Sequence, residues 1–318
     1  MKCIPFSNQF GALVINCTVQ DILSNPSYQT QLREKLCVYK ILHLPNQTLT
    51  PEEEQQLATL FPHQDQSGPY RKSFQQWKLP DYPHIQVQGW GTISNHYGLS
   101  GTMKPKVGSL EWHTDGIHET EYPPYITQIY CIETPLKGGQ TLFLDTTSLW
   151  EQLSKEEQER YRNIMVIYKQ TRNKIATNGC LSLSGKANVY HSPEDDIQTN
   201  LSNTNIRQPL FRQIPETKQI SMSVAPMYLS HMEGYSFEES SKFIESLIQQ
   251  IIQTQYVHTY QQGDILLFDN RQCLHSAMPN HDIDCSHSTR LLHRIRMDSS
   301  SKIIPLLPSD ETVTTKES

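Results

Sequence analysis

Short apolar runs separated by polar turns dominate the middle and the end of this chain, and they constrain its fold most. Runs of this kind are typical of β-strands. Strands are expected at 11–17, 38–42, 125–133, 141–144 and 264–269. Helices are expected at about 28–36, 51–60, 148–162 and 237–253. This order predicts a mainly β fold with flanking helices, in the form of a β-sandwich or jelly roll.

The length of 318 residues is sufficient for one large domain with a sizeable core. We expect a single domain over residues 1–298, in which the polar stretch 170–215 is a lid or an insertion. The Ser/Thr/Pro/Lys-rich residues 299–318 are expected to form a flexible C-terminal tail.

Charge and cysteine content narrow the class of protein. The net charge is -6 and no stripe of Lys and Arg occurs, which argues against nucleic acid as a partner. The chain has no apolar run long enough to span a membrane, and its start lacks the apolar segment of a signal peptide. Its seven cysteines are widely spaced without a CxxC pair, so we expect a reduced, cytoplasmic protein.

The first chemical signal is the tetrapeptide Trp112-His113-Thr114-Asp115. In a strand, side chains two residues apart point to the same face, so His113 and Asp115 can both reach one ion. Such a pair also occurs by chance. A buried histidine paired with a carboxylate is the alternative interpretation.

The second signal is the segment from Gly263 to His275, where a turn leads into an apolar strand that ends in a polar corner. Two histidines and one carboxylate on one face leave three coordination positions open, a set that suits iron(II) chemistry with oxygen. Zinc is the rival metal. A structural zinc site takes four protein ligands, and no cysteine is suitably placed for one, but a catalytic zinc with three ligands stays open.

The third signal lies near the end of the expected domain, where Arg290, Arg294 and Arg296 share one face of an expected strand. Arginines that point into a core need an anion as partner. A dicarboxylate co-substrate would supply one through a bidentate, charge-assisted contact. A solvated basic edge strand is the alternative.

These segments and two more follow one another in a recognisable order. Trp-His-Thr-Asp at 112–115 precedes Pro-Pro at 123–124 and Gly-Gly-Gln-Thr-Leu-Phe at 138–143. Asp-Asn-Arg-x-x-x-His then occupies 269–275, and Arg-Leu-Leu-His-Arg occupies 290–294. The succession resembles the WHTD…PP…GGDTLF, DNRxxxH and RxxHR motifs of the taurine dioxygenase (TauD/TfdA) family of iron(II)/2-oxoglutarate oxygenases.

The resemblance covers roughly residues 10–298 and implies a double-stranded β-helix, a cupin-like jelly roll. It also implies roles for single residues. His113, Asp115 and His275 would bind iron(II), and Thr141 and Arg290 would bind the far carboxylate of 2-oxoglutarate. Arg294 would bind an acidic group of the prime substrate.

The implied reaction couples decarboxylation of 2-oxoglutarate by O2 to oxidation of an unactivated C–H bond. The substrate would be a small carboxylate-bearing, amino-acid-like metabolite. Hydroxylation, desaturation and oxidative cyclisation of the kainoid-synthase kind all begin with the same step. Halogenation is not expected, because related halogenases carry Gly or Ala where this chain has Asp115.

Two other classes of protein are compatible with parts of the pattern. A catalytically silent jelly-roll sensor would bind a metal or an organic acid without forming succinate. A zinc hydrolase would stay active without oxygen. Among other residues, His118 is expected to be a pocket or surface histidine, and Trp90, His96 and Tyr97 either line the pocket or pack as loop residues.

Overall fold

The computed structural model describes residues 1–61, 77–103, 111–118, 124–169, 180–182, 185–187, 205–278, 288–298 and 306. Its helices are α1 (Val19–Ser24), α2 (Pro26–Tyr39), α3 (Pro51–Thr59), α4 (Thr147–Gln152), α5 (Lys155–Tyr161) and α6 (Phe237–Ile251). No helix in this part of the chain is long and apolar enough to cross a membrane.

The strands before residue 200 are β1 (Lys2–Pro5), β2 (Ala12–Ile15), β3 (Ile41–Leu44), β4 (Gln86–His96), β5 (Leu99–Met103), β6 (Pro124–Glu133), β7 (Thr141–Asp145), β8 (Met165–Tyr168), β9 (Cys180–Ser182) and β10 (Gly185–Ala187). The later strands are β11 (Ile206–Pro209), β12 (Phe211–Gln213), β13 (Ile220–Met222), β14 (Leu229–Met232), β15 (Tyr256–His258), β16 (Ile265–Asp269), β17 (Cys273–Ala277) and β18 (Arg290–Asp298).

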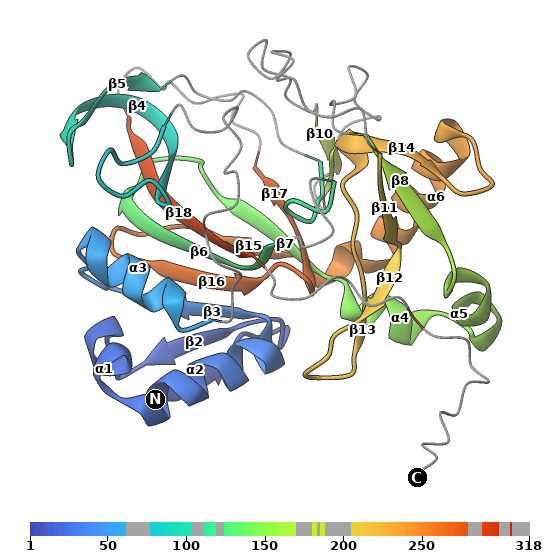
Figure 1. Ribbon diagram of the computed structural model, residues 1–318, viewed down its shortest axis with the longest axis horizontal. Coiled ribbons are helices and arrows are strands. Elements are labelled where there is room, and N and C mark those ends of the chain that lie inside the picture. The colour runs from blue at the N-terminus through green and yellow to red at the C-terminus, as the bar shows by residue number, and fades with distance from the viewer. Residues whose placement is uncertain are drawn as a thin grey trace, which may run out of the picture.

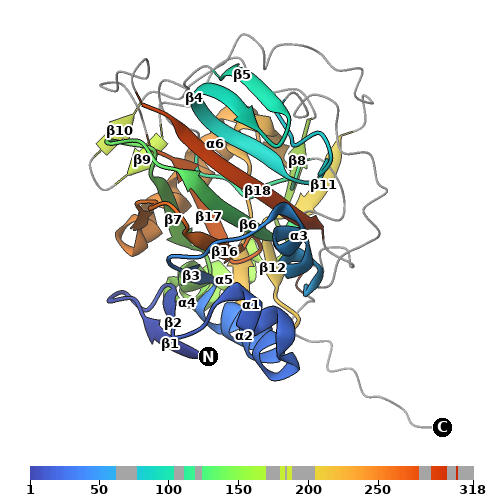
Figure 2. The same cartoon turned by 90° about the vertical axis from the view of Figure 1, so that its left-hand side faces the viewer.

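An eight-stranded sheet forms the larger half of the jelly roll, in the order β1-β2-β3-β16-β6-β18-β4-β5. Its strands pair antiparallel, except for β2 with β3, which are parallel. A smaller antiparallel sheet has the order β15-β7-β17. Figure 2 shows β18 crossing the larger sheet between β4 and β6.

A hydrophobic core between these two sheets joins them. Ile41, Leu266 and Phe268 of the larger sheet pack with Phe143 of β7 and Cys273 of β17. Because side chains alternate along a strand, each of these strands turns every second residue toward this inter-sheet core. The two facing sheets make the double-stranded β-helix that the sequence predicts.

Helices cover the other face of the larger sheet beside β1, β2 and β3 (Figure 1). Thr18 and Thr50 cap α1 and α3, each through a capping box with an acidic residue three positions later. Leu32, Leu36 and Leu57 of α2 and α3 are fully or almost fully buried there. Burial of this apolar helix face fixes the N-terminal unit, which comprises β1 to β3 and α1 to α3, on the rest of the sheet.

The outer face of the smaller sheet is also covered. A third core packs Leu142, Leu144 and Leu274 from the smaller sheet against α4, α6 and the sheet β11-β8-β14. Ser236 caps α6, whose buried residues Ile244, Leu247, Ile248 and Ile251 recur at helical spacing. Figure 1 shows these elements on the opposite side of the molecule from α1–α3.

The predicted fold class is confirmed, and one predicted helix is divided in two while part of one predicted strand belongs to a helix. The expected helix at 148–162 is two helices, because Leu153 is extended and Ser154 caps a new helix. Val38 and Tyr39 belong to α2 rather than to a strand. Lys40 then ends that helix in the left-handed conformation, with φ of 69°.

Two expected segments lie mostly outside the described residues. Within the predicted lid or insertion at 170–215, the structure describes β9, β10 and residues 205–215, which contain β11 and β12. Of the predicted tail, 299–318, only Leu306 is described, and it is buried in the third core.

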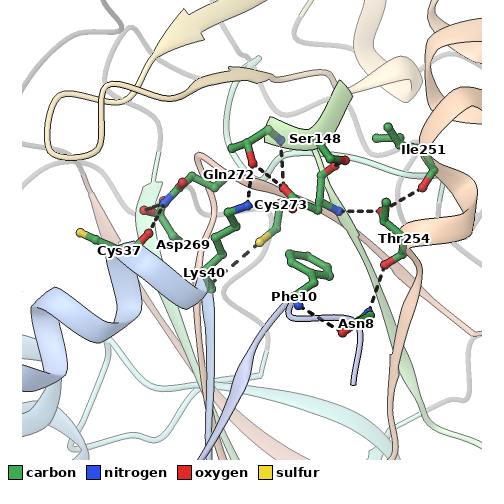
Figure 3. Close-up of polar contacts among 12 residues, drawn as sticks. Asn8, Phe10, Cys37, Lys40, Ser148, Ile251, Thr254, Asp269, Gln272 and Cys273 are labelled. Carbon is green, nitrogen blue, oxygen red and sulfur yellow. Dashed lines mark hydrogen bonds and ion pairs between the residues drawn. The ribbon is translucent and has the colours of Figure 1, made fainter. Parts of the chain in front are cut away.

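Lys40 ties the N-terminal unit to both sheets (Figure 3). Its ammonium lies 2.7 Å from Asp145 Oδ2 and 2.6 Å from Thr147 Oγ1, at the end of β7. Its carbonyl accepts a hydrogen bond of 2.8 Å from the amide of Asp269, at the end of β16. A single residue therefore holds α2, β7 and the turn that leads into β17.

We expect Lys40→Met to destabilise the protein by about 2–4 kcal/mol, because it leaves Asp145 with an uncompensated, largely buried charge. Urea unfolding measures this change. The control is Lys242→Met, which removes a Lys–Glu238 pair of similar N–O distance, 2.8 Å, from the exposed face of α6. It should unfold like the unaltered protein. Equal effects of the two substitutions would contradict the role given to Lys40.

Candidate metal centre

Two histidines from distant parts of the sequence are joined by their backbones. His113 and His275 form an isolated antiparallel bridge, in which each amide donates to the other's carbonyl at 3.1 and 3.0 Å. His275 lies on β17, and like Cys273 two residues earlier it faces the inter-sheet core. The two imidazole rings consequently lie side by side, with centroids 4.2 Å apart.

Asp115 reaches the same point, though not through a strand as the sequence predicts. The backbone turns after His113, and Gly116 takes a φ of 68°. The side chain of Asn270 fixes this turn. Its Oδ1 accepts from the amide of Asp115 at 2.9 Å, and its Nδ2 donates to the carbonyls of Asp115 and Pro124 at 3.0 and 2.8 Å.

The three side chains form a compact, buried donor set. One ligand atom from each of His113, Asp115 and His275 lies within 4.8 Å of the others. The Nε2 atoms of the two histidines are 3.7 and 3.8 Å from the carboxylate oxygens of Asp115. These separations are longer than hydrogen bonds and leave room for an ion.

The protonation states favour a cation at this point. Burial, together with His113, lowers the pKa of His275 to about 3, so its imidazole is neutral. Burial raises the pKa of Asp115, but the Arg294 guanidinium and His275 outweigh it and hold that pKa well below its usual range. A metal requires neutral imidazole and ionised carboxylate groups as ligands, and His275 and Asp115 meet this requirement. His113 Nδ1 lies 2.8 Å from the carbonyl of Glu111, which leaves Nε2 available.

The chemistry of this donor set fits iron(II). Two imidazole nitrogens and one carboxylate oxygen on one side of an ion leave positions open for other ligands. Three protein ligands are one fewer than a structural zinc site uses. The arrangement therefore fits an open, reactive metal centre.

Alternation along β18 sends its arginines to this side of the sheet. Arg290, Arg294 and Arg296 occupy alternate positions of the strand, on the same face as Leu292. Leu292 packs in the inter-sheet core, so this face is turned toward the smaller sheet. The intervening residues Leu291, Ile295 and Met297 belong to the core under α1–α3. The strand face predicted from the sequence is thus the face toward the metal centre.

Arg290 lies among groups that leave its charge uncompensated. Its Nε donates to the carbonyl of Gly139 at 3.0 Å, and its guanidinium lies 5.5 Å from the ring centroids of both Trp90 and Tyr260. Tyr260 Oη and Thr141 Oγ1 are 3.0 Å apart beside it. Burial lowers the pKa of Arg290, and no carboxylate in the described part of the chain pairs with it. This subsite suits an incoming anion.

Glycine is required where the 138–143 motif meets Arg290. Gly139 has a φ of 78°, and a Cβ built there would lie 2.9 Å from Arg290 Cδ and 3.0 Å from its Nε. A larger residue would displace the arginine from the subsite. The motif spacing therefore reflects close packing of the backbone against a side chain.

Arg294 contacts the metal centre itself. Its NH1 lies 3.3 Å from Asp115 Oδ2, while its NH2 and Nε donate to Gln86 Oε1 at 2.7 and 3.1 Å. Arg294 therefore contacts an expected metal ligand directly, which binding of the substrate alone would not require. Any acidic substrate group that it binds must therefore lie beside the metal.

The other residues singled out from the sequence have separate places. His118 is buried and stacks on Tyr228 with ring centroids 3.4 Å apart. Trp90 lines the Arg290 subsite. His96 contacts His293, whose Nδ1 is 2.7 Å from Glu54 of α3, on the other side of β18.

Sequence reasoning missed three residues that shape the site, namely Gln86, Tyr260 and Asn270 in its clamping role. The Asp-Asn-Arg motif contained the signal for Asn270. Gln86 and Tyr260 carried no signal, because they lie in segments that match no motif and meet Arg294 and Thr141 only through the fold.

Comparisons with known proteins agree with this geometry. The profile described as "Taurine catabolism dioxygenase TauD, TfdA family" matches residues 3–296. The (S)-phenoxypropionate/alpha-ketoglutarate-dioxygenase of Delftia acidovorans is 28% identical over 204 residues, which are 61% of this chain and 64% of that protein. The 3-((Z)-2-isocyanoethenyl)-1H-indole synthase of Fischerella ambigua is 27% identical over 60% of this chain and 63% of its own length. The chain thus spans under two thirds of these relatives.

A crystal structure of a putative alpha-ketoglutarate-dependent taurine dioxygenase from Burkholderia xenovorans has the same fold. The TM-score is 0.70, at 19% sequence identity, over 96% of this chain and 91% of that one.

We expect Asn270→Ala to weaken divalent-metal binding roughly 10- to 100-fold, the effect typical of losing a group that orients metal ligands. Isothermal titration with Mn²⁺ measures it. Asn95→Ala, which removes an exposed amide from the β4–β5 hairpin, serves as the control and should bind as before. Unchanged affinity in a folded Asn270→Ala protein would show that the Asp115 turn holds without the clamp.

Proposed function

The chain belongs to the TauD, TfdA family of dioxygenases, and from this premise we propose that it is a non-haem iron(II)- and 2-oxoglutarate-dependent oxygenase. The convergence of His113, Asp115 and His275 beside a partly buried Arg290 that pairs with no carboxylate in the described part of the chain carries the proposal. The first three would bind iron(II). Arg290 and Thr141 would bind the far carboxylate of 2-oxoglutarate through charge-assisted and hydroxyl contacts.

Iron with 2-oxoglutarate and O2 supplies an oxidant for an unactivated C–H bond, and the chain's own residues position the reactants. The bridge between His113 and His275 orients both imidazoles before a metal binds. Trp90 and Tyr260 flank the guanidinium of Arg290 and shield part of it from water, which strengthens the contact with a carboxylate.

We expect Arg290→Ala to raise the 2-oxoglutarate dissociation constant roughly 10- to 100-fold, because a hydrogen-bonded charge contact contributes about 1.5–3 kcal/mol. Anaerobic titration with iron(II) and 2-oxoglutarate, followed by the visible charge-transfer band of the chelate, measures it. The band should be absent in His113→Ala.

Arg207→Ala is the matched control, because Arg207 pairs with Glu233 on the surface. It should leave the band and the dissociation constant unchanged. Iron binding without a band in the unaltered protein would refute the co-substrate. Metal binding without succinate formation under oxygen would instead support a silent sensor.

We further propose that the prime substrate is a small carboxylate-bearing, amino-acid-like metabolite and that Arg294 binds its acidic group. Arg294 faces the metal side of β18 and contributes a second cation there. The relative named for (S)-phenoxypropionate is named for an anion, and the indole synthase is named for a biosynthetic step. Hydroxylation, desaturation and oxidative cyclisation are all compatible with this site.

We also propose that the protein is cytoplasmic.

We expect Arg294→Ala to reduce substrate oxidation at least tenfold while the iron–2-oxoglutarate band still forms, because the acidic group loses its partner. Product formation and succinate release, measured together over a panel of carboxylates, separate the two steps. Arg294→Lys should restore part of the coupling. If the band and substrate oxidation are lost together, Arg294 acts on the metal centre by holding Asp115 and does not bind the substrate.

A further inference from the structure

A second cluster of metal-binding side chains lies outside the proposed iron centre. It consists of His43 of β3, His258 of β15, and Asp264, which directly precedes β16. One ligand atom from each lies within 4.8 Å of the others. His258 and Asp264 are 2% and 1% exposed. Neither the family motifs nor the proposed reaction uses these residues.

The two sheets bring the histidines together. His43 lies two residues after Ile41 and so shares its face, which is part of the inter-sheet core. On β15, His258 shares the face of Tyr256, whereas Val257 between them is exposed. Since β3 and β15 belong to opposing sheets, the imidazoles meet across the core, with ring centroids 4.8 Å apart.

A tight turn presents the carboxylate. Gly263 has a φ of 86°, and a Cβ there would lie 2.7 Å from the carbonyl oxygen of Gln47. The amide of Gln47 donates to the Gly263 carbonyl at 2.7 Å, which fastens the loop after β3 to this turn. Asp264 Oδ2 accepts from the amide of Gln261 at 2.8 Å, and Oδ1 lies 2.9 Å from His43 Nε2.

The ring nitrogens that face the cluster make no hydrogen bond of good geometry, although His43 Nε2 lies close to Asp264 Oδ1. His258 Nε2 is 3.7 Å from Asp264 Oδ2, too far for a hydrogen bond. The Nε2 atoms of His43 and His258 are both buried and lack a partner of hydrogen-bond geometry in the described part of the chain. His258 Nδ1 is 2.9 Å from Tyr256 Oη, and in the tautomer whose Nδ1 donates to that oxygen the Nε2 lone pair is directed toward Asp264. Burial of two such nitrogens is unfavourable unless something binds them.

We propose that His43, His258 and Asp264 form a second metal site, which takes a divalent ion of the zinc type and links β3 and β16 of the larger sheet to β15 of the smaller one. Two imidazoles and one carboxylate are donors that zinc accepts, and a water completes four-coordination on the His43 side, where the side chain is 17% exposed. The site lies behind the proposed co-substrate pocket, because Tyr260 contacts both His258 and Thr141.

The competing arrangement is an ion pair between a protonated His43 and Asp264, with His258 packed beside it. That arrangement binds no metal. The two alternatives differ in the number of zinc ions per chain, which is independent of whether the chain oxidises any substrate.

The experiment counts zinc by elemental analysis after removal of metals with a chelator, equilibration with Zn²⁺ and dialysis. His275→Ala, which lacks a ligand of the iron centre, isolates the second cluster and should retain one zinc per chain. Adding His43→Gln should abolish this zinc. His231→Gln, at a partly exposed position on β14, is the control and should leave the count at one.

Thermal unfolding supplies the second readout. Zinc should raise the melting temperature of His275→Ala by several degrees and leave that of His275→Ala/His43→Gln unchanged, because a ligand that binds only the folded state stabilises it. No zinc in folded His275→Ala overturns the proposal, as does an equal count after His43→Gln. The first of these outcomes decides the matter even if the double variant does not fold. The iron–2-oxoglutarate band tests the proposed function separately.

Discussion

The pair of backbone hydrogen bonds between His113 and His275 is the constraint on which the metal centre depends. These residues are far apart in sequence; His275 is held by the pairing of β17 with β7, whereas His113 joins this strand only through the bridge. The bridge sets both imidazoles side by side, and the Asn270 amide then brings Asp115 to them. Because backbone and amide groups fix all three proposed ligands, the side chains are arranged without a metal, and binding of one would cost little reorganisation.

Positive charge on one face of β18 is the second organising feature. Three arginines face the inter-sheet space, where burial of an unpaired guanidinium is unfavourable. Asp115 pairs with Arg294, whereas the contacts of Arg290 in the described part of the chain are a carbonyl and two aromatic rings. No described carboxylate neutralises Arg290, and its subsite therefore favours an anionic ligand.

Much of this fold and site could be predicted from the sequence, since strand periodicity and ordered motifs are local signals. Alternation along β18 predicted that its arginines share one face, as they do. The Asp-Asn-Arg motif predicted the turn between the apolar strand and His275. The turn at Asp115 was missed, because Asn270, which holds it, lies 155 residues away. Gln86, Tyr260 and the cluster at His43 escaped for the same reason. Their neighbours come from other strands, and only the paired sheets show which residues meet.

The position of β3 inside the larger sheet has a consequence for the chain as a whole. It lies between β2 and β16, and β16 carries the corner that leads to His275. A chain without its N-terminal unit would leave β16 as an open edge, with unpaired amides and carbonyls beside the fully buried side chains of Ile265 and Leu267. Open apolar edges of this kind pair with other chains. The N-terminal segment therefore covers the edge of β16 and protects it from pairing with other chains.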